Sequence, residues 1–526
     1  MRWTIALIAA AALAQDVTFD RLKNALKEQQ NWMTYHGDYS GQRHRTLKQI
    51  NSTNVKDLRV DWIFQTGQPG EFQGMPLVVD GVMYLTSANG VAFALDARSG
   101  RQLWRYSYPV PKNELLANGT VNRGFAILGN QLFMVTPDCH LLSLDARTGE
   151  LLWNVTMEDN KKGYGATLAP LVVGDKVIAG VGGGEYGIRG FIAAFDARSG
   201  KEVWKFYTIP AKGEKGGETW LDDSWQRGGG PAWMTGTYDP QLNTLYWSVG
   251  NPGPDLFGDV RQGDNLYTCS VLALDPNTGK LKWHFQFTPH DTHDWDANQT
   301  NMLVDMNYKG QARKLLLQAN RNGFHYVLDR VTGEFLSGKA FAPQTWAVGL
   351  DEKGRPIEKP GTRPSKEGTP VCPGLAGATN WMAPALNPET GWFYFAVRNQ
   401  CDVFYEAPPV YVAGKAYWGS VFRGWSEKRE SGSVKAMDPI STDTKWEFPL
   451  AKAPWSGVLS TGGQVIFATD LDGYIMALES KTGALLWKFN LGYALKSSPI
   501  TWEVGGRQYI TMGAGSSVVS FALPKP

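Results

Sequence analysis

Short runs that alternate apolar and polar residues recur along the chain, and glycine-containing turns separate them. The clearest form is an apolar run, the turn Asp-x-x-[Ser/Thr]-Gly, and a second run that ends at tryptophan, as in ALDARSGRQLW. Alternation with a period of two predicts half-buried strands, and the turn supplies side-chain hydrogen bonds and a glycine for positive φ. Each copy therefore predicts a β-hairpin.

In five copies the acidic residue and the tryptophan lie eight positions apart. The five pairs are Asp96 and Trp104, Asp145 and Trp153, Asp196 and Trp204, Asp275 and Trp283, and Glu479 and Trp487. A weaker copy joins Asp438 to Trp446, and the turn at Asp329 lacks the tryptophan. Regularly placed indoles are typical of packing between adjacent sheets, so we interpret most of the 21 tryptophans as structural.

These repeats predict an all-β fold, an eight-bladed β-propeller with tryptophan-docking repeats. Some gaps between the seven marked copies exceed the roughly 40–50 residues of a four-stranded blade, which indicates insertions or an unmarked blade. We expect the eighth blade to combine N-terminal LRVDWIF with C-terminal QYITMGAGSSVVSFAL and so to close the ring. Insertions gather on propeller faces and around the central channel, where segments of different blades would form a site.

Composition and charge change this picture little. The 526 residues carry 52 Lys plus Arg and 50 Asp plus Glu, which argues against a nucleic-acid surface. Residues 1–14 contain one Arg, an apolar run and a final Ala-Leu-Ala, and so predict a cleaved signal peptide; a buried helix is the alternative. We expect residues 15–526 to form a single exported propeller domain without a membrane span.

Four cysteines are present, and the lack of a CxxC pair argues against an attached c-type haem and a four-cysteine zinc site. Cys372 and Cys401 flank one strand-rich segment and are the candidate disulfide of an exported protein. Unpaired core cysteines are the alternative for all four, and this alternative is favoured for Cys139 and Cys269.

The segment PHDTHDWDANQ, residues 289–299, holds three aspartates and two histidines. Three carboxylates cannot all be buried in ionised form without a compensating cation. Asp294 and Asp296 alternate around a tryptophan and can point to one side, which suits Ca²⁺ or a larger or more highly charged hard cation. A solvated acidic turn is the alternative. Zinc on His290 and His293 is disfavoured because no third ligand of recognised spacing accompanies them.

Two further segments place oxygen donors in unusual settings. In VGGGEYGIRG, Glu185 follows three glycines that allow close approach of the backbone to a ligand. In YWSVGNPGP, Asn251 stands between Gly and Pro at the end of an apolar strand. Either segment alone is a weak indication, because glycines and asparagines are ordinary residues of turns.

Together the motifs resemble those of pyrroloquinoline quinone (PQQ) dependent alcohol dehydrogenases of the methanol and ethanol dehydrogenase family. The matching motifs, in the family's order, are the Trp-marked repeat, GGGEYGIRG, GGGPAW, GNPGP, PHDTHDWD, NRNGFHYVLDR and GATNWMAP. They span nearly the whole mature chain. The resemblance implies an eight-bladed propeller, in agreement with the repeats, together with PQQ and one metal ion.

The resemblance assigns three metal ligands, Glu185, Asn251 and Asp294, with Asp294 also the proposed catalytic base. Asp296 is similar to the additional aspartate that marks the lanthanide-dependent methanol dehydrogenases. It favours a lanthanide over Ca²⁺, because a further carboxylate better compensates a trivalent ion. A position outside the ligand shell is the alternative for Asp296. The other polar residues of this loop are expected to shape it: His290, Asp291 and His293.

For the cofactor, Trp233 matches the tryptophan on which the PQQ ring stacks, with blade packing as the alternative. Arg321 matches the arginine beside the reactive carbonyl of PQQ, where its charge would stabilise the reduced oxygen. The other positions that match the surroundings of the quinone are Gln73, Arg123, Thr167, Gly183, Gly184, Asn380 and Trp455. Gln73 stands where methanol enzymes commonly have Glu, so its hydrogen bond would be neutral.

One departure concerns the face of the quinone opposite the stacking tryptophan. Many family members carry an adjacent cysteine pair at the positions of Ala117 and Asn118. The vicinal disulfide is therefore absent here, which puts in doubt how that face is covered.

The resemblance implies periplasmic oxidation of alcohols to aldehydes, with short primary alcohols such as methanol or ethanol favoured. Because no haem motif is present, electrons would pass to a separate c-type cytochrome. No nucleic-acid partner is expected, and a homodimer is compatible with the sequence. The alternatives are a non-enzymatic propeller scaffold of an outer-membrane assembly complex and an inactive relative of the PQQ enzymes. A scaffold would not need Glu185, Asn251, Asp294 and Arg321 together.

Overall fold

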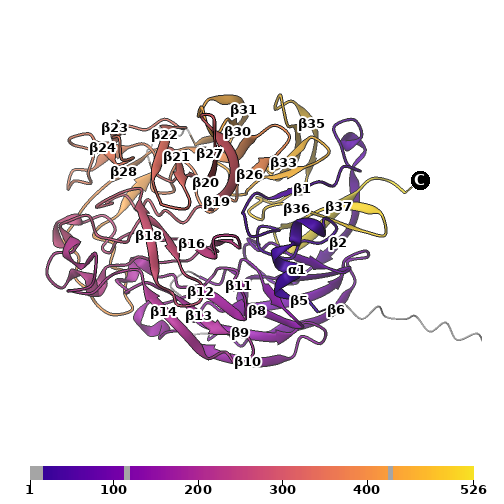
Figure 1. The fold of residues 1–526 in the computed structure, drawn as a ribbon, viewed down its shortest axis with the longest axis horizontal. Coiled ribbons are helices and arrows are strands. Elements are labelled where there is room, and N and C mark those ends of the chain that lie inside the picture. The colour runs from indigo at the N-terminus through magenta and orange to yellow at the C-terminus, as the bar shows by residue number, and fades with distance from the viewer. Residues whose placement is uncertain (1–15, 112–118, 425–429, 526) are drawn as a thin grey trace, which may run out of the picture.

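Eight β-sheets arranged in a ring make up the fold (Figure 1). The computed structural model describes residues 16–111, 119–424 and 430–525, so the expected signal peptide and the departure at Ala117 and Asn118 lie outside the described residues. Neighbouring strands within each of the eight sheets pair antiparallel, with a short parallel addition of β1 to one sheet. The predicted all-β, eight-bladed propeller is confirmed.

Five sheets take four consecutive strands each. They comprise β3 (Leu77–Val79), β4 (Val82–Thr86), β5 (Val91–Asp96), β6 (Gln102–Ser107); β7 (Ala126–Leu128), β8 (Gln131–Val135), β9 (His140–Asp145), β10 (Leu151–Thr156); β11 (Leu171–Val173), β12 (Lys176–Gly180), β13 (Phe191–Asp196), β14 (Glu202–Tyr207); β15 (Thr237–Asp239), β16 (Thr244–Ser248), β17 (Ser270–Leu274), β18 (Leu281–Gln286); and β19 (Met302–Tyr308), β20 (Gln311–Ala319), β21 (Phe324–Asp329), β22 (Phe335–Ala340).

The remaining three sheets carry the insertion and the ring closure. They comprise β26 (Ala385–Asn387), β27 (Trp392–Asn399), β30 (Ser431–Met437), β31 (Thr444–Leu450); β1 (His44–Arg45), β32 (Leu459–Thr461), β33 (Val465–Thr469), β34 (Tyr474–Glu479), β35 (Leu485–Asn490); and β2 (Arg59–Gln65), β38 (Ser517–Ala522), β37 (Arg507–Ala514), β36 (Ile500–Val504). In the last sheet β2 pairs antiparallel with β38, so the two ends of the chain close the ring as predicted (Figure 1).

The repeated tryptophans dock each blade onto the next. Trp104 in β6 donates its indole N–H to the carbonyl of Ala146, in the turn of the following blade, at 2.9 Å. Gly149 of that turn lies flat against the ring, and a Cβ at this glycine would stand 2.7 Å from it. The same indole-to-turn hydrogen bond joins four other pairs: Trp62 to Ala97, Trp153 to Ala197, Trp204 to Pro276, and Trp446 to Ser480. The turn and the tryptophan of the repeat therefore serve neighbouring blades.

The described helices are short, and none is long and apolar enough to cross a membrane. They are α1 (Phe19–Lys23) and the 3-10 turns η1 (Ala25–Lys27), η2 (Val55–Asp57), η3 (Ala88–Gly90), η4 (Asn160–Lys162), η5 (Gly184–Tyr186), η6 (Gly217–Thr219), η7 (Ser224–Arg227) and η8 (Gly258–Arg261).

A long insertion in two parts, between β22 and β26 and between β27 and β30, adds small sheets outside the ring. Their strands are β23 (Ala347–Leu350) with β24 (Pro356–Glu358), and β25 (Thr369–Val371) with β28 (Asp402–Phe404) and β29 (Phe422–Gly424). The predicted disulfide Cys372–Cys401 lies here, whereas Cys139 and Cys269 are free and buried, as favoured. Part of the insertion packs on loops of the ring, because Tyr417 N–H donates to the Glu185 carbonyl at 2.6 Å.

Candidate active site

Three carboxylates from the loops of two neighbouring blades meet at one place. Glu185 comes from η5 after β12, Asp255 from the loop after β16, and Asp294 from the loop after β18. One ligand atom of each lies within 4.8 Å of those of the other two. Carboxylate oxygens at this separation can share one hard cation.

Asn251 supplies a further oxygen beside this cluster. The residue is fully buried, and its Nδ2 donates to Asp255 Oδ1 at 2.9 Å. Its Oδ1 has no hydrogen-bond partner in the described part of the chain, and neither has the buried Oδ1 of Asp294. A Cβ on Gly184 would stand 2.6 Å from the amide oxygen, so only glycine leaves room there. Buried acceptors without a donor are costly, and a cation would satisfy both. The donor set therefore fits a hard metal ion.

Asp296 lies next to this cluster but its carboxylate is engaged by other donors. Its Oδ1 accepts from the main-chain N–H of Asn251 at 2.6 Å. Its Oδ2 accepts from Trp233 Nε1 at 2.9 Å and from Arg321 Nη1 at 2.7 Å. Among the predicted ligands, Glu185 and Asp294 are thus directly clustered, and Asn251 and Asp296 adjoin them.

Burial makes these carboxylates difficult to ionise without a cation. Removal from water, together with the charge of Asp296, raises the pKa of Glu185 to about 7. Burial also raises the pKa of Asp255 and of Asp294 well above the ordinary range, with a contribution from neighbouring carboxylates. Arg321 opposes the rise at Asp294. A bound cation would remove the cause of these shifts and favour the ionised forms.

Arg321, in the turn between β20 and β21, bridges the two aspartates of the predicted catalytic loop. Its Nη2 lies 3.3 Å from Asp294 Oδ2, and the same nitrogen donates to the carbonyl of Leu375 at 2.7 Å. Its Nη1 holds Asp296 at 2.7 Å. The guanidinium is therefore fixed beside the predicted base, in position to stabilise negative charge.

The loop that carries Asp294 is held in a specific conformation. Asp291 accepts from the main-chain N–H groups of His293 and Trp295, at 3.2 and 2.9 Å. Asp294 itself has a φ of 60°, in the left-handed region that aspartate adopts at modest cost. His293 Nε2 pairs with the carbonyl of Thr362 at 2.8 Å and its ring stacks on Trp295. His290 similarly pairs with the Gly263 carbonyl. These residues shape the loop, in keeping with the expectation from sequence.

The predicted cofactor residues form a second group that adjoins the first through Trp233. The indole of Trp233 is partly exposed, its N–H meets Asp296, and Arg123 lies 4.8 Å from its ring centroid. Arg123 donates to Gln73 Oε1 at 2.9 Å and to Thr167 Oγ1, and its buried Nε has no partner in the described chain. An unsatisfied guanidinium donor beside a partly exposed indole suits a flat ligand that carries carboxylates.

The other predicted cofactor positions lie at the edges of this group. Asn380 donates to the carbonyl of Ala376 at 2.9 Å, in the same loop that holds Arg321. Trp455 stacks on Trp381 at 6.4 Å between centroids, and Arg123 also lies over Trp381. Gly183 has a φ of 108°, and a Cβ there would stand 2.0 Å from the Gly163 carbonyl. Gly184 continues this glycine turn into η5.

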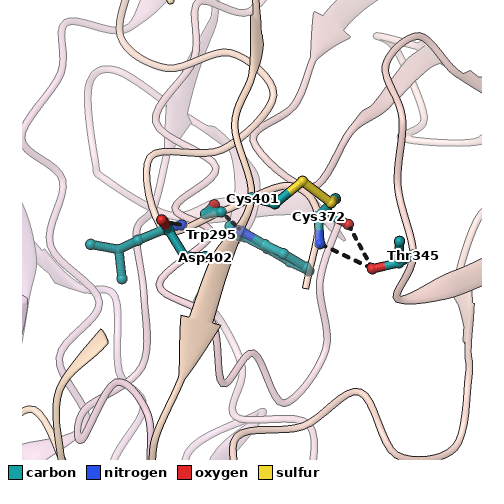
Figure 2. Close-up of a disulfide and its surroundings, with 7 residues drawn as sticks. Trp295, Thr345, Cys372, Cys401 and Asp402 are labelled. Carbon is teal, nitrogen blue, oxygen red and sulfur yellow. Dashed lines mark hydrogen bonds between the residues drawn. A yellow bond between two sulfur atoms is a disulfide. The ribbon is translucent and has the colours of Figure 1, made fainter. Parts of the chain in front are cut away.

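A disulfide-linked loop supports the catalytic loop from outside (Figure 2). The indole N–H of Trp295 donates to the Gly374 carbonyl at 3.0 Å, two residues after Cys372. Asp402, next to Cys401, accepts from the main-chain N–H of Leu375 at 2.7 Å. Because the carbonyl of Leu375 accepts from Arg321, this loop positions both Trp295 and the arginine.

Sequence reasoning missed three residues of the site. Asp255 follows Asn251 by four positions in GNPGPD, an acid between proline and an apolar pair, which is the available sequence signal. Arg261 is fully buried and donates to the carbonyls of Pro254, Asp255 and Asp291, which joins two site loops. Trp381 follows the predicted Asn380 directly, but its contact with Arg123 depends on the fold.

Comparison with known proteins bears on both the fold and the site. The PQQ family model described as glucose/ethanol/alcohol dehydrogenase, beta-propeller domain, matches residues 32–339 and 423–510. Quinoprotein alcohol dehydrogenase PedH of Pseudomonas putida is 37% identical over 540 residues, which cover 97% of this chain and 90% of that protein. A lanthanide-dependent methanol dehydrogenase of Methylacidiphilum fumariolicum is 35% identical over 542 residues, 97% of this chain and 88% of that protein.

A solved structure agrees with these relatives. The europium-containing methanol dehydrogenase superposes with a TM-score of 0.91 at 32% identity, over 96% of this chain and 100% of that chain. The fold is thus that of a propeller-type quinoprotein oxidoreductase. The chain belongs to the family of PQQ-dependent alcohol dehydrogenases.

Proposed function

We propose that the protein oxidises short primary alcohols, of the methanol or ethanol type, to aldehydes, with PQQ and one metal ion as cofactors. The observation that carries this proposal is the position of Arg321, which bridges Asp294 and Asp296 beside the three-carboxylate cluster. The proposed base Asp294, the cationic Arg321 and the carboxylates that would bind the metal therefore lie together in one buried site. The family supports the reaction class.

The residues divide into two binding roles. Glu185, Asn251, Asp294 and Asp296 would hold the metal. The polar groups of PQQ would be bound by Arg123, Thr167, Gln73 and Asn380. Its rings would contact Trp233 and Trp455. The absence of side chains at Gly183 and Gly184 would let the cofactor approach the backbone there. When bound, PQQ supplies a hydride acceptor and the metal ion a Lewis acid.

The chain's own residues move the proton and stabilise charge. Asp294, in its ionised form, accepts the proton of the alcohol hydroxyl. Arg321 keeps Asp294 oriented and presents a fixed positive charge where negative charge develops. Burial around Asp294 excludes water, which strengthens both interactions.

A lanthanide is favoured over Ca²⁺ in this proposal because the site is rich in carboxylates. Asp296 contributes one more negative charge than a glutamate, an asparagine and one aspartate alone would provide. Its carboxylate already adjoins Asn251, whose main-chain N–H it accepts. A trivalent ion compensates this charge better than a divalent one.

Electron transfer and location follow from the same proposal. We assign a separate c-type cytochrome as the acceptor and the periplasm as the compartment, reached through the cleaved signal peptide. Reduction of the purified cytochrome under alcohol turnover tests the acceptor, and sedimentation tests whether the protein is a homodimer.

The rival function is a propeller scaffold that binds no cofactor. It gives no reason for the buried Asn251 Oδ1 and Arg123 Nε, which have no partner in the described chain. It also leaves several buried carboxylates without a cation. The site therefore favours the enzyme.

Reconstitution distinguishes these functions. The mature protein is combined with PQQ and either Ca²⁺ or La³⁺, and dye reduction is followed over a series of alcohols. We expect alcohol-dependent reduction that is faster with La³⁺. No reduction with either metal would contradict the enzyme. Activity with Ca²⁺ alone, or full lanthanide activity in Asp296→Ala, would contradict the role of Asp296; Asp259→Ala, at an exposed acid nearby, is the control.

A further inference from the structure

Asp255 is buried, and its carboxylate forms no salt bridge with a cation of the described residues. Its exposed fraction is 4%, and Asn251 Nδ2 is the side-chain donor that the described residues offer it. The buried Arg261 donates to the main-chain carbonyls of Pro254 and Asp255 at 3.0 and 3.2 Å rather than to the carboxylate. A buried, ionised carboxylate without a cationic partner is costly in free energy, and a bound cation would compensate its charge.

The place where that charge would lie is defined by other groups. A carboxylate oxygen of Asp255 is within 4.8 Å of ligand atoms of both Glu185 and Asp294. Independently, the fully buried Asn251 Oδ1 has no partner in the described chain, and its amide is turned so that the nitrogen faces Asp255. Three clustered carboxylates and an adjoining amide oxygen without a partner are thus brought together.

The surroundings hold Asp255 at this point. Arg261 also donates to the carbonyl of Asp291 at 2.6 Å and so fixes the loop of Asp255 against the loop of Asp294. From the insertion, the Trp418 carbonyl accepts from Leu256 N–H at 2.8 Å, and Tyr417 N–H donates to the Glu185 carbonyl at 2.6 Å. These contacts hold the backbone of the Asp255 loop, whereas the carboxylate contacts the amide of Asn251 at the metal-binding cluster.

We propose that Asp255 is a direct ligand of the metal ion, a carboxylate additional to those of Glu185, Asp294 and Asp296. The inference rests on the proposed function, because it requires the metal. Among the described residues, Arg321 is the guanidinium that forms salt bridges with these four carboxylates, so their formal charge together is three minus. That charge matches a trivalent lanthanide and exceeds the charge of Ca²⁺.

The test is metal binding to chelator-treated, PQQ-loaded protein, with Tb³⁺ as the probe and tryptophan-sensitised luminescence as the signal. Trp233 and Trp295 adjoin the site and serve as antennas. Asp255→Asn removes the charge but keeps an oxygen that can accept from Asn251. We expect the Kd for Tb³⁺ to rise more than about 100-fold, since loss of an outer partner alone costs about 10–100-fold. Ca²⁺ affinity should fall less.

Luminescence lifetimes in H₂O and D₂O provide a second readout. If Asp255 binds the ion, the variant admits additional coordinated water, which a purely orienting residue would not change. An unchanged water count with less than tenfold loss of affinity in Asp255→Asn overturns the inference. If Asp255→Ala loses Tb³⁺ affinity but Asp255→Asn does not, Asp255 only orients the side chain of Asn251, and the inference is likewise overturned.

Two comparisons separate this inference from the proposed function. Asp259→Asn, at an exposed acid four residues further on, should leave affinity and water count unchanged. Glu185→Gln should abolish high-affinity binding. If wild type binds no Tb³⁺, or Glu185→Gln binds as wild type does, the metal site of the proposed function is wrong. If Asp255→Asn binds Tb³⁺ as wild type does while Glu185→Gln does not, the proposed function stands and Asp255 is not a ligand.

Discussion

The indole N–H of Trp295 donates to the main-chain carbonyl of Gly374 at 3.0 Å. This hydrogen bond joins the residue between Asp294 and Asp296 to the loop that begins at Cys372. The disulfide thereby stabilises more than the insertion in which it lies (Figure 2). Loss of the disulfide is expected to affect both stability and the geometry of the site.

Replacement of Cys372 and Cys401 by serine tests this link. The cross-link closes a segment of 29 residues in sequence separation, and its removal is expected to cost about 3–4 kcal/mol of unfolding free energy. Under conditions where the variant stays folded, we expect weaker Tb³⁺ binding and a lower kcat, because Trp295 and Arg321 lose support. Urea unfolding and metal titration measure the two effects. Replacement of the free Cys139 is the control, and an unchanged Tb³⁺ affinity in the folded double variant would contradict the positioning role.

Arg321→Lys tests whether the forked guanidinium is needed in addition to its charge. Lysine cannot contact Asp294, Asp296 and the Leu375 carbonyl at once as the two terminal nitrogens of Arg321 do. We expect kcat to fall about 10²–10³-fold, the usual effect of removing one positioned donor. Steady-state kinetics on the reconstituted enzyme measure it, with Arg313→Lys as the surface control. Wild-type kcat in Arg321→Lys would show that charge alone suffices.

The repeats predicted the ring because each copy carries its own strand, turn and strand in contiguous sequence. The pairing of β2 with β38 was also predictable, since both chain ends had unpartnered strand patterns. Which indole meets which turn was not predictable in detail: Trp104 packs on Gly149 of the next blade, and this offset depends on how the blades are arranged around the ring.

At the site, sequence identified residues that lie in motifs but not the distances between them. Glu185 and Asp294 are far apart in the chain and meet only because their blades converge on one face. Asp255 was missed because an acid after a Pro-rich turn is ordinary until its burial is known. Likewise, Arg261 was missed because it donates to main-chain carbonyls, and the sequence does not indicate which carbonyls an arginine will contact.

Metal-free protein is expected to lose stability as the pH rises from about 4.5 to about 7. Burial raises the pKa of Glu185 from 4.5 to about 7, so the folded state holds a proton that the unfolded chain releases. This contribution is fully present below pH 4.5 and is lost as the pH rises through the folded-state pKa. Urea unfolding of chelator-treated protein across this range measures the change, and Glu185→Gln should reduce it, while the raised pKa values of Asp255 and Asp294 keep part of the pH dependence.

The same shift predicts that metal binding releases protons. Near pH 6, Glu185 is protonated in the metal-free protein and must ionise to bind a cation. Calorimetric titration with La³⁺ in buffers of different ionisation enthalpy should therefore show proton release at pH 6, and the share of Glu185 in that release should decline above pH 7. An absence of proton release at pH 6 would contradict the raised pKa.

Gly149→Ala is expected to destabilise the ring more than an otherwise similar substitution at Gly174. Both glycines have positive φ, at 76° and 66°, so alanine costs about 1 kcal/mol at either position from backbone conformation. Only at Gly149 would the new Cβ stand 2.7 Å from Trp104, whereas nothing lies within 4 Å at Gly174. The ring must shift, which adds about 1–3 kcal/mol of overpacking strain and weakens the indole hydrogen bond to Ala146. Thermal and urea unfolding of the two variants measure the difference, and equal losses would show that the turn does not depend on close contact with the tryptophan.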